Sequence, residues 1–181
     1  MKPAAGGFCF LGAAAAERLV ILGAMVHILL VCMGNICRSP MAASVMHAEV
    51  VRRGLAGRVA LDSAGTYGAH QGEKADRRAV ALAQARGYGQ IVHERARKVT
   101  EADFERFDLI LAMDRDNLAE LQRVCPAELR HKLHLFLAYA GVEERTEVPD
   151  PYFGNAAGFE VVLKLCEQGV DGVLRRVVQA A

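Results

Sequence analysis

The most constraining feature of the sequence is an apolar, β-rich run over residues 27–31 that leads directly into a nine-residue loop, residues 32–40, with the sequence CMGNICRSP. A helix-like run follows and reaches residue 53, so this part of the chain predicts a buried strand, a tight loop and a helix in succession. Gly34 lets the backbone turn sharply, and the N–H groups of the loop can then converge on one anion at the helix N-terminus. We therefore expect a phosphate-binding loop within an α/β domain.

The remaining apolar runs extend this pattern along the chain. Strands are expected at residues 59–62, 109–113 and 133–136, and helices at residues 40–53, 76–86, 116–124 and 159–178, with a short helix starting near Thr100 and Asp103. Strands that alternate with helices form a parallel sheet covered on both faces. The sequence therefore predicts a flavodoxin-like α/β fold, a four-stranded parallel sheet with helices on both faces. Ligands bind such sheets outside the carboxyl ends of the strands, which is where Cys32 lies.

Composition excludes several classes of function. The chain has 181 residues, the length of one compact domain, and a formal net charge of +1, without the basic surplus of a nucleic-acid-binding protein. No apolar run reaches membrane-spanning length. The five cysteines lack the paired spacing of a disulfide framework or a zinc site, which favours a reducing, cytoplasmic compartment. We expect no cofactor, no metal, and neither nucleic acid nor membrane as a partner.

The first 24 residues allow two interpretations. Lys2 precedes an apolar stretch over residues 6–16, an order of residues found in secretory signals. We favour instead a non-catalytic extension over residues 1–24 and a domain over residues 25–181, because Met25 lies just before the first strand and a catalytic thiol belongs in a reducing compartment. Residues 13–22 are compatible with a helix.

Cys32 and Arg38 carry the chemistry that the loop suggests. Of the five cysteines, only Cys32 is followed six positions later by an arginine. Arg38 can clamp phosphate oxygens with two parallel hydrogen bonds, and aligned N–H dipoles beside a guanidinium favour the thiolate form of a cysteine. The alternative, a buried apolar cysteine that ends a strand, suits the bare spacing but not the surrounding Gly, Arg and Ser. The loop lacks the Gly-Lys-Ser/Thr ending of a nucleotide-binding loop, which argues against ATP or GTP.

Four segments in order resemble the low-molecular-weight protein tyrosine phosphatase family. They are CMGNICRSP, residues 62–66 (DSAGT), His93 with Ala96 and Arg97, and residues 150–152 (DPY). The resemblance implies hydrolysis of protein phosphotyrosine, and of small aryl phosphates, through a cysteinyl-phosphate intermediate on Cys32. It also implies that Asp150 is the general acid, although an Asp-Pro pair alone is typical of a turn. The partner would be a phosphotyrosine-containing protein, and the enzyme a monomer or weak dimer.

The resemblance also assigns binding and supporting roles. The substrate-binding residues would be Met33, Gly34, Asn35, Ile36, Cys37, Ser39, Tyr152 and Phe153. Ser63 and His93 would support the loop through Asn35. Ser39 can either donate to the thiolate or cap the next helix, and Arg97 and Lys98 are expected on a solvated face.

Two departures from the family's pattern leave substrate range open. A second tyrosine often stands where this chain has Phe153, and a larger residue often stands near Ala69, for which His70 or Tyr67 are candidate replacements.

The resemblance also implies that Cys37 forms a reversible, protective disulfide with Cys32.

Three alternative functions remain. A thioredoxin-coupled arsenate reductase on the same fold needs a further cysteine pair in the middle of the chain, and none lies between Cys37 and Cys125. Related protein-arginine phosphatases carry Thr where Ile36 stands. A non-catalytic phosphate-binding module would be favoured by loss of Cys32, Arg38 or Asp150, but all three are present.

Overall fold

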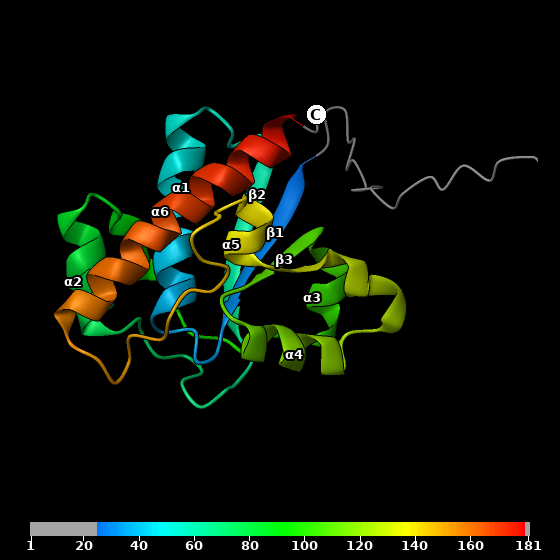
Figure 1. Ribbon diagram of the computed structural model, residues 1–181, viewed down its shortest axis with the longest axis horizontal. Coiled ribbons are helices and arrows are strands. Elements are labelled where there is room, and N and C mark those ends of the chain that lie inside the picture. The colour runs from blue at the N-terminus through cyan, green and yellow to red at the C-terminus, as the bar shows by residue number, and fades with distance from the viewer. Residues whose placement is uncertain (1–24, 180–181) are drawn as a thin grey trace, which may run out of the picture.

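The computed structural model describes residues 25–179, which form a parallel four-stranded sheet covered by helices (Figure 1). The strands are β1 (Val26–Cys32), β2 (Val59–Gly65), β3 (Leu109–Ala112) and β4 (Leu133–Leu135), in the order β2-β1-β3-β4. The helices are α1 (Arg38–Arg52), α2 (Arg77–Ala85), α3 (Glu101–Arg106), α4 (Arg115–Val124), α5 (Phe136–Ala140) and α6 (Ala156–Gln179), with 3-10 turns η1 (Gly89–His93) and η2 (Ala127–Lys132). The predicted flavodoxin-like fold is confirmed; the helix predicted at residues 13–22 lies outside the described residues.

Strand β1 is buried on both faces, and its side chains divide the core in two. Ile28 and Leu30 belong to a large apolar cluster, whereas Leu29 and Val31 belong to a smaller one on the opposite face. Alternation with a period of two along a strand produces this division. Helices α1, α2, α5 and α6 cover the first face, and α3 and α4 cover the second (Figure 1).

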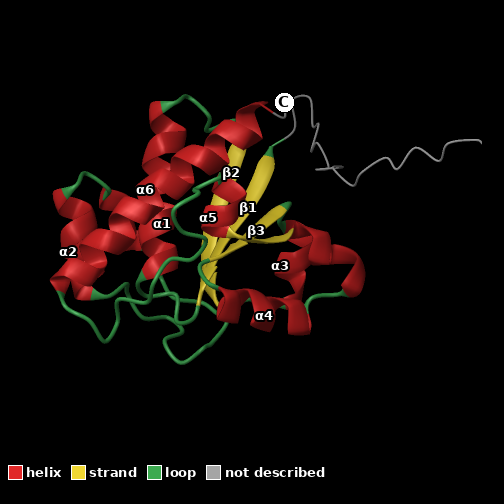
Figure 2. Cartoon of the chain, in the orientation of Figure 1, coloured by secondary structure: helices red, strands yellow, loops and turns green. Residues whose placement is uncertain are grey.

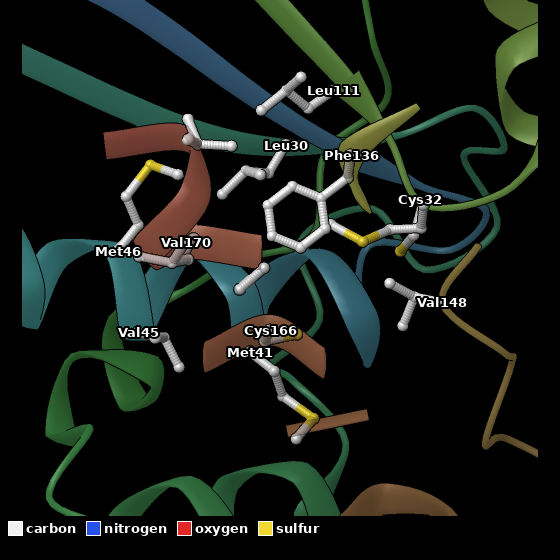
Figure 3. Packing of buried hydrophobic residues seen from close by; sticks show 14 of the residues in the cluster. Leu30, Cys32, Met41, Val45, Met46, Leu111, Phe136, Val148, Cys166 and Val170 are labelled. Atoms are coloured by element: carbon white, nitrogen blue, oxygen red, sulfur yellow. The ribbon is translucent and has the colours of Figure 1, made fainter. Parts of the chain in front are cut away.

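Helix α6 packs unusually close to α5 at the centre of the larger cluster. A Cβ atom on Gly169 would lie 2.4 Å from the Phe136 ring, and one on Gly172 would lie 2.2 Å from the carbonyl oxygen of Ala140. Figure 3 shows Phe136 lying between the sheet residues Leu30 and Cys32 and the helices beneath. The prediction of a strand over residues 133–136 was therefore wrong at its end, because Phe136 starts α5 and turns its ring into this core.

The helix termini follow the sequence in most places. Thr100 and Asp103 form the expected capping box, and Asp76 caps α2. Helix α1 differs, because it begins at Arg38 after Cys37, with no side chain capping its N-terminus. Ser39 is therefore not the N-cap, and the first N–H groups of α1 remain open toward the loop.

The loops that follow the strands gather at one edge of the sheet, below the carboxyl ends of β1, β2 and β3 (Figure 2). This edge carries the loop after β1 and the segment before α6. Within residues 25–179, no helix has both the length and the apolar character needed to cross a membrane.

Candidate active site

Cys32 ends β1 and places its thiol at the bottom of an open cavity of about 160 Å³. The residue is only 2% exposed, and its Sγ lies 3.1 Å from Ser39 Oγ and 3.3 Å from the backbone nitrogen of Asn35, which donates to it. The sulfur therefore contacts one hydroxyl group and one backbone N–H group inside the loop. Of the two roles considered for Ser39, the structure therefore supports the contact with the thiol.

The backbone of the loop offers further donors to the same cavity. The N–H groups of Gly34, Ile36 and Cys37 have no acceptor among residues 25–179. They precede the uncapped N-terminus of α1, where the helix dipole also favours negative charge. An anion seated here would satisfy donors that the chain itself leaves unpaired.

Asn35 fixes the shape of the loop from inside the protein. Its φ of 56° is the one positive value at a non-glycine residue within the described part of the chain. Its side-chain amide donates to Ser39 Oγ at 2.9 Å and to Ser63 Oγ at 2.8 Å, and its side-chain oxygen accepts from the backbone N–H of Arg97 at 2.9 Å. Three bonds from three segments therefore hold a left-handed residue that the loop requires.

The support behind Ser63 differs from the sequence prediction. Ser63 Oγ donates to Glu94 Oε2 at 2.8 Å, whereas His93 ends η1 and is exposed. Burial raises the pKa of Glu94, and the nearby Asp62 adds to this, although the hydrogen bond from Ser63 opposes it. Glu94, the residue after His93, therefore occupies the place behind Ser63 that the sequence assigned to His93.

Arg97 also departs from its predicted place on a solvated face. Its guanidinium contacts Asp62 at 2.9 Å and Asp103 at 2.9 Å, and so links β2 to the start of α3. The two carboxylates raise the pKa of Arg97 although burial opposes it. These ion pairs hold the backbone N–H that binds Asn35.

Gly65 is a further support that sequence reasoning did not find. It ends β2 beside the loop, and a Cβ atom there would lie 2.6 Å from the carbonyl oxygen of Met33. The loop approaches this strand too closely for any side chain. A glycine that ends a strand next to a binding loop is the signal that marks such a contact.

Arg38 is buried, at 2% exposure, yet its guanidinium reaches the cavity and is held by two carboxylates. It contacts Asp114, lies 2.5 Å from Asp150 Oδ2, and donates to the carbonyl oxygen of Val148 at 3.3 Å. Burial alone would lower its pKa, but the negative charges of Cys32, Asp114 and Asp150 raise it. Sequence reasoning did not single out Asp114, although its position two residues after the end of β3 was a signal.

The segment that carries Asp150 is exposed and is held from outside. The side chain of Asp150 is 44% exposed, and its Oδ1 accepts from the backbone N–H of Tyr152 at 3.0 Å. Arg78 donates to the carbonyl oxygens of Tyr152 at 3.0 Å and Gly154 at 3.2 Å, and its guanidinium lies 4.6 Å from the centre of the Phe159 ring. Sequence reasoning did not single out Arg78.

Aromatic and apolar side chains form the walls above the thiol. Tyr152 and Phe153 meet edge to face with ring centres 5.0 Å apart, and Phe153 is 97% exposed. Met33, Ile36, Tyr67 and His70 line the rest of the same cavity. Ala69 does not line it; His70, whose ring centre is 6.4 Å from that of Tyr152, takes that place. The cavity therefore suits a flat aromatic group above a tetrahedral anion.

Cys37 lies inside the loop and is buried. Burial, with the negative charges of Asp76 and Cys32 adding to it, raises the pKa of Cys37 to about 12. Cys37 therefore stays a neutral thiol near pH 7 and does not compete with Cys32 as a nucleophile.

Comparisons with known proteins agree with this geometry. The sequence model of the family described as Low molecular weight phosphotyrosine protein phosphatase matches residues 27–181. The low molecular weight protein-tyrosine-phosphatase of Streptomyces coelicolor is 43% identical over 150 residues, which are 81% of this chain and 90% of that protein. The low molecular weight phosphotyrosine protein phosphatase of Schizosaccharomyces pombe is 42% identical over 137 residues, 74% of this chain and 85% of that protein.

A solved structure shares the fold as well. The crystal structure of protein tyrosine phosphatase from Entamoeba histolytica, with Hepes in its active site, matches with a TM-score of 0.81 at 37% identity. The match covers 85% of this chain and 97% of that one. The similarity therefore extends over the sheet, the helices and the loops that form the cavity.

Proposed function

The chain belongs to the low molecular weight phosphotyrosine protein phosphatase family, and from that premise we propose how its residues hydrolyse phosphotyrosine. Cys32 is the nucleophile, Arg38 with the loop amides binds the phosphate, and Asp150 is the general acid. The single observation that carries the proposal is the meeting of these three side chains in one cavity, with the thiol beneath unpaired N–H groups. Tyr152 and Phe153 hold the phenyl ring.

The first step transfers the phosphoryl group to the enzyme. The Cys32 thiolate attacks phosphorus, so an S–P bond forms while the P–O bond to the tyrosine ring breaks. Arg38 and the free N–H groups of the loop bind the three equatorial oxygens, where charge spreads in the transition state. Asp150 gives its proton to the departing phenolate oxygen, and the dephosphorylated tyrosine leaves.

The second step releases phosphate. Asp150, now a carboxylate, takes a proton from a water molecule that attacks phosphorus, and the S–P bond breaks. Ser39, 3.1 Å from the sulfur, donates a hydrogen bond to the departing thiolate. The same hydrogen bond stabilises the nucleophile before the first step.

Arg38 has to change partners when a substrate arrives. Its guanidinium is bound by Asp114 and Asp150 in the structure. A phosphate dianion competes for the same donors because it accepts two parallel hydrogen bonds from a guanidinium. The substrate therefore frees Asp150 from the guanidinium, and the carboxylate then takes up a proton from solvent before it acts as the acid.

Trapping the covalent intermediate tests the proposal. A phosphotyrosine peptide mixed with the enzyme and quenched in acid should leave a phosphoryl group on Cys32, detected by mass spectrometry of the digested protein. Cys32→Ser should remove both the label and turnover, while still binding vanadate. Label on another residue, or turnover by Cys32→Ser, would remove Cys32 from the mechanism.

We also propose that the enzyme acts in the cytoplasm on phosphotyrosine-containing proteins, as a monomer or weak dimer. The cysteines within residues 25–179 are all free, as a reducing compartment requires. Cell fractionation tests the compartment and light scattering tests the oligomeric state.

A further inference from the structure

A second cavity, of about 420 Å³, adjoins the one above Cys32. The two share Met33, Arg38, Tyr67 and Asp150 as a common wall. A peptide whose phosphotyrosine fills the first cavity therefore places a residue near it in sequence over the second. The mechanism proposed above makes no use of this second cavity.

The second cavity is strongly acidic. Asp114, Asp116, Glu120 and Asp150 line it, against the single guanidinium of Arg38. Asp116 has no ion-pair partner among residues 25–179, and Glu120 is paired at 3.0 Å with the exposed Arg123. When a phosphate takes the guanidinium of Arg38, Asp114 loses part of its compensating charge, while Asp150 is protonated as the general acid. Asp114, Asp116 and Glu120 are then the carboxylates that make the cavity negative.

A buried, unpaired acceptor also lines this cavity. Asn117 is 4% exposed, and its side-chain oxygen has no hydrogen-bond partner in the described part of the chain. A buried polar atom without a partner destabilises a protein unless a donor from elsewhere reaches it. This observation is independent of the carboxylates and points to a ligand that carries N–H groups.

We propose that this cavity binds a lysine or arginine side chain of the substrate protein, from a position close to the phosphotyrosine. The inference rests on the proposed phosphatase function. Such a side chain has an apolar stem that fits the exposed faces of Met33 and Tyr67 in the shared wall, and a charged head whose donors suit the carboxylates and Asn117.

A metal ion fits this cavity less well than an organic cation. Within residues 25–179, no three His, Cys, Asp or Glu side chains come close enough together to hold a metal. The carboxylates are instead spread around a wide opening. A long, flexible cationic side chain can reach carboxylates that are spread in this way, whereas a single metal ion would not bridge them.

Matched phosphopeptides test the proposal. Each set has phosphotyrosine with lysine, glutamine or glutamate placed in turn at the three positions on either side, and kcat/KM is measured at low salt. Because one exposed charge pair changes binding about threefold, we expect lysine to exceed glutamate about tenfold at one or two positions. The ratio should fall as salt screens the pair.

Variants then locate the effect. In Asp116→Asn/Glu120→Gln the lysine-to-glutamate ratio should fall to about threefold or less. The matched control Glu105→Gln/Glu128→Gln removes two exposed carboxylates that line neither cavity, and it should keep the parent's ratio. Circular dichroism establishes whether both variants fold. If one does not, the lysine-to-glutamate ratio of the parent enzyme alone tests the proposal.

The outcomes separate the two proposals. Hydrolysis of all peptides at equal rates at low salt overturns the basic-residue subsite and leaves the phosphatase function intact. A parent-like ratio in Asp116→Asn/Glu120→Gln also overturns it. Failure to hydrolyse any phosphotyrosine peptide, with intact fold and bound vanadate, overturns the phosphatase function itself.

Discussion

The loop after β1 and the segment around Asp150 serve one reaction but are held in opposite ways. Asn35 and Ser39 are buried, and their bonds to Ser63 and to each other lie beneath the cavity, away from water. The segment around Asp150 is largely exposed, and apart from the contact of Asp150 with Arg38 it is bound by Arg78, which is itself exposed. Buried bonds between fixed partners resist opening, whereas exposed ones open at low cost in free energy.

The difference follows from what each region has to do. Phosphate binding gains most from donors that are fixed before the substrate arrives, because no reorganisation is then needed in the transition state. In the proposed mechanism Asp150 leaves Arg38, meets the phenolate oxygen and later meets water, so the acid has to change its contacts during the reaction.

Replacing Arg38 tests the phosphate-binding part of the site, whose donors are fixed. Arg38→Lys keeps the charge but loses the planar, two-point contact with phosphate, and we expect kcat/KM to fall about 10³-fold. Steady-state kinetics with p-nitrophenyl phosphate measure this loss. Arg175→Lys, on the exposed face of α6, is the matched control and should keep the parent's rate. An Arg38→Lys variant within a few-fold of the parent would mean that charge alone suffices.

Replacing Asp150 tests the exposed segment that carries the proposed acid. Asp150→Asn should slow phosphotyrosine hydrolysis about 10²-fold but affect p-nitrophenyl phosphate much less, because p-nitrophenolate leaves without a proton. Rates across a series of aryl phosphates should therefore depend steeply on the leaving-group pKa in the variant and little in the parent. Because the variant also frees Arg38 of one carboxylate, inorganic phosphate should inhibit it more strongly. Equal slopes in the two proteins would make Asp150 a turn residue only.

Arg78 tests whether the exposed segment needs its outer support. Arg78→Lys loses the stacking on Phe159 and one of the two carbonyl contacts, and we expect kcat for phosphotyrosine to fall about tenfold. The leaving-group dependence should steepen in the same direction as in Asp150→Asn, while inhibition by phosphate stays unchanged.

Arg77→Lys is the matched control, since Arg77 is the exposed neighbour of Arg78 at the start of α2. It should behave as the parent in each measurement. Weaker phosphate inhibition in Arg78→Lys would mean that the two regions are not held independently.

Glu94 predicts a small pH dependence of stability. Because burial raises its pKa in the fold, the folded state keeps a proton that the unfolded chain releases, and stability falls as pH rises through that interval. Glu94→Gln still accepts from Ser63 but cannot ionise. We expect it to be more stable than the parent at pH 8 by about 1 kcal/mol or less, with the difference vanishing near pH 4.

Thermal unfolding measured from pH 4 to pH 8 tests this expectation. Glu144→Gln, on the exposed loop before Val148, is the control and should follow the parent at every pH. A parent that gains stability between pH 5 and pH 8 relative to Glu94→Gln would contradict the sign.

The sequence predicts the parallel sheet correctly, and it singles out Cys32, Arg38 and Asp150, which line one cavity in the structure. Periodicity places Ile28 to Val31 in a buried strand, and the spacing of Cys32 and Arg38 has few structural uses besides binding an anion. These signals depend only on residues close together in the sequence, so they can be recognised without knowledge of the tertiary structure. The order of segments along the chain then led to Asp150.

The supports behind the site could not be found in the same way. Glu94, not His93, contacts Ser63 after the 3-10 turn η1, and which of two neighbouring polar residues faces the loop depends on tertiary packing. Asp114 also caps α4 through the N–H of Asn117, so in the sequence it is indistinguishable from an ordinary cap. Arg78 is an exposed arginine at a helix start, and only the return of the chain near Gly154 gives it a role.

The pairing of Arg38 with Asp150 has a further consequence, for the choice among anions. An empty site that already contains a carboxylate next to the guanidinium favours ligands that outcompete that carboxylate. Doubly charged oxyanions such as phosphate and arsenate can do so, whereas chloride or acetate, with one charge, gain little from the exchange. The Asp150 carboxylate is thereby a weak internal competitor for Arg38. An anion has to carry enough charge to displace it, which keeps the abundant monovalent anions of the cell from occupying the site.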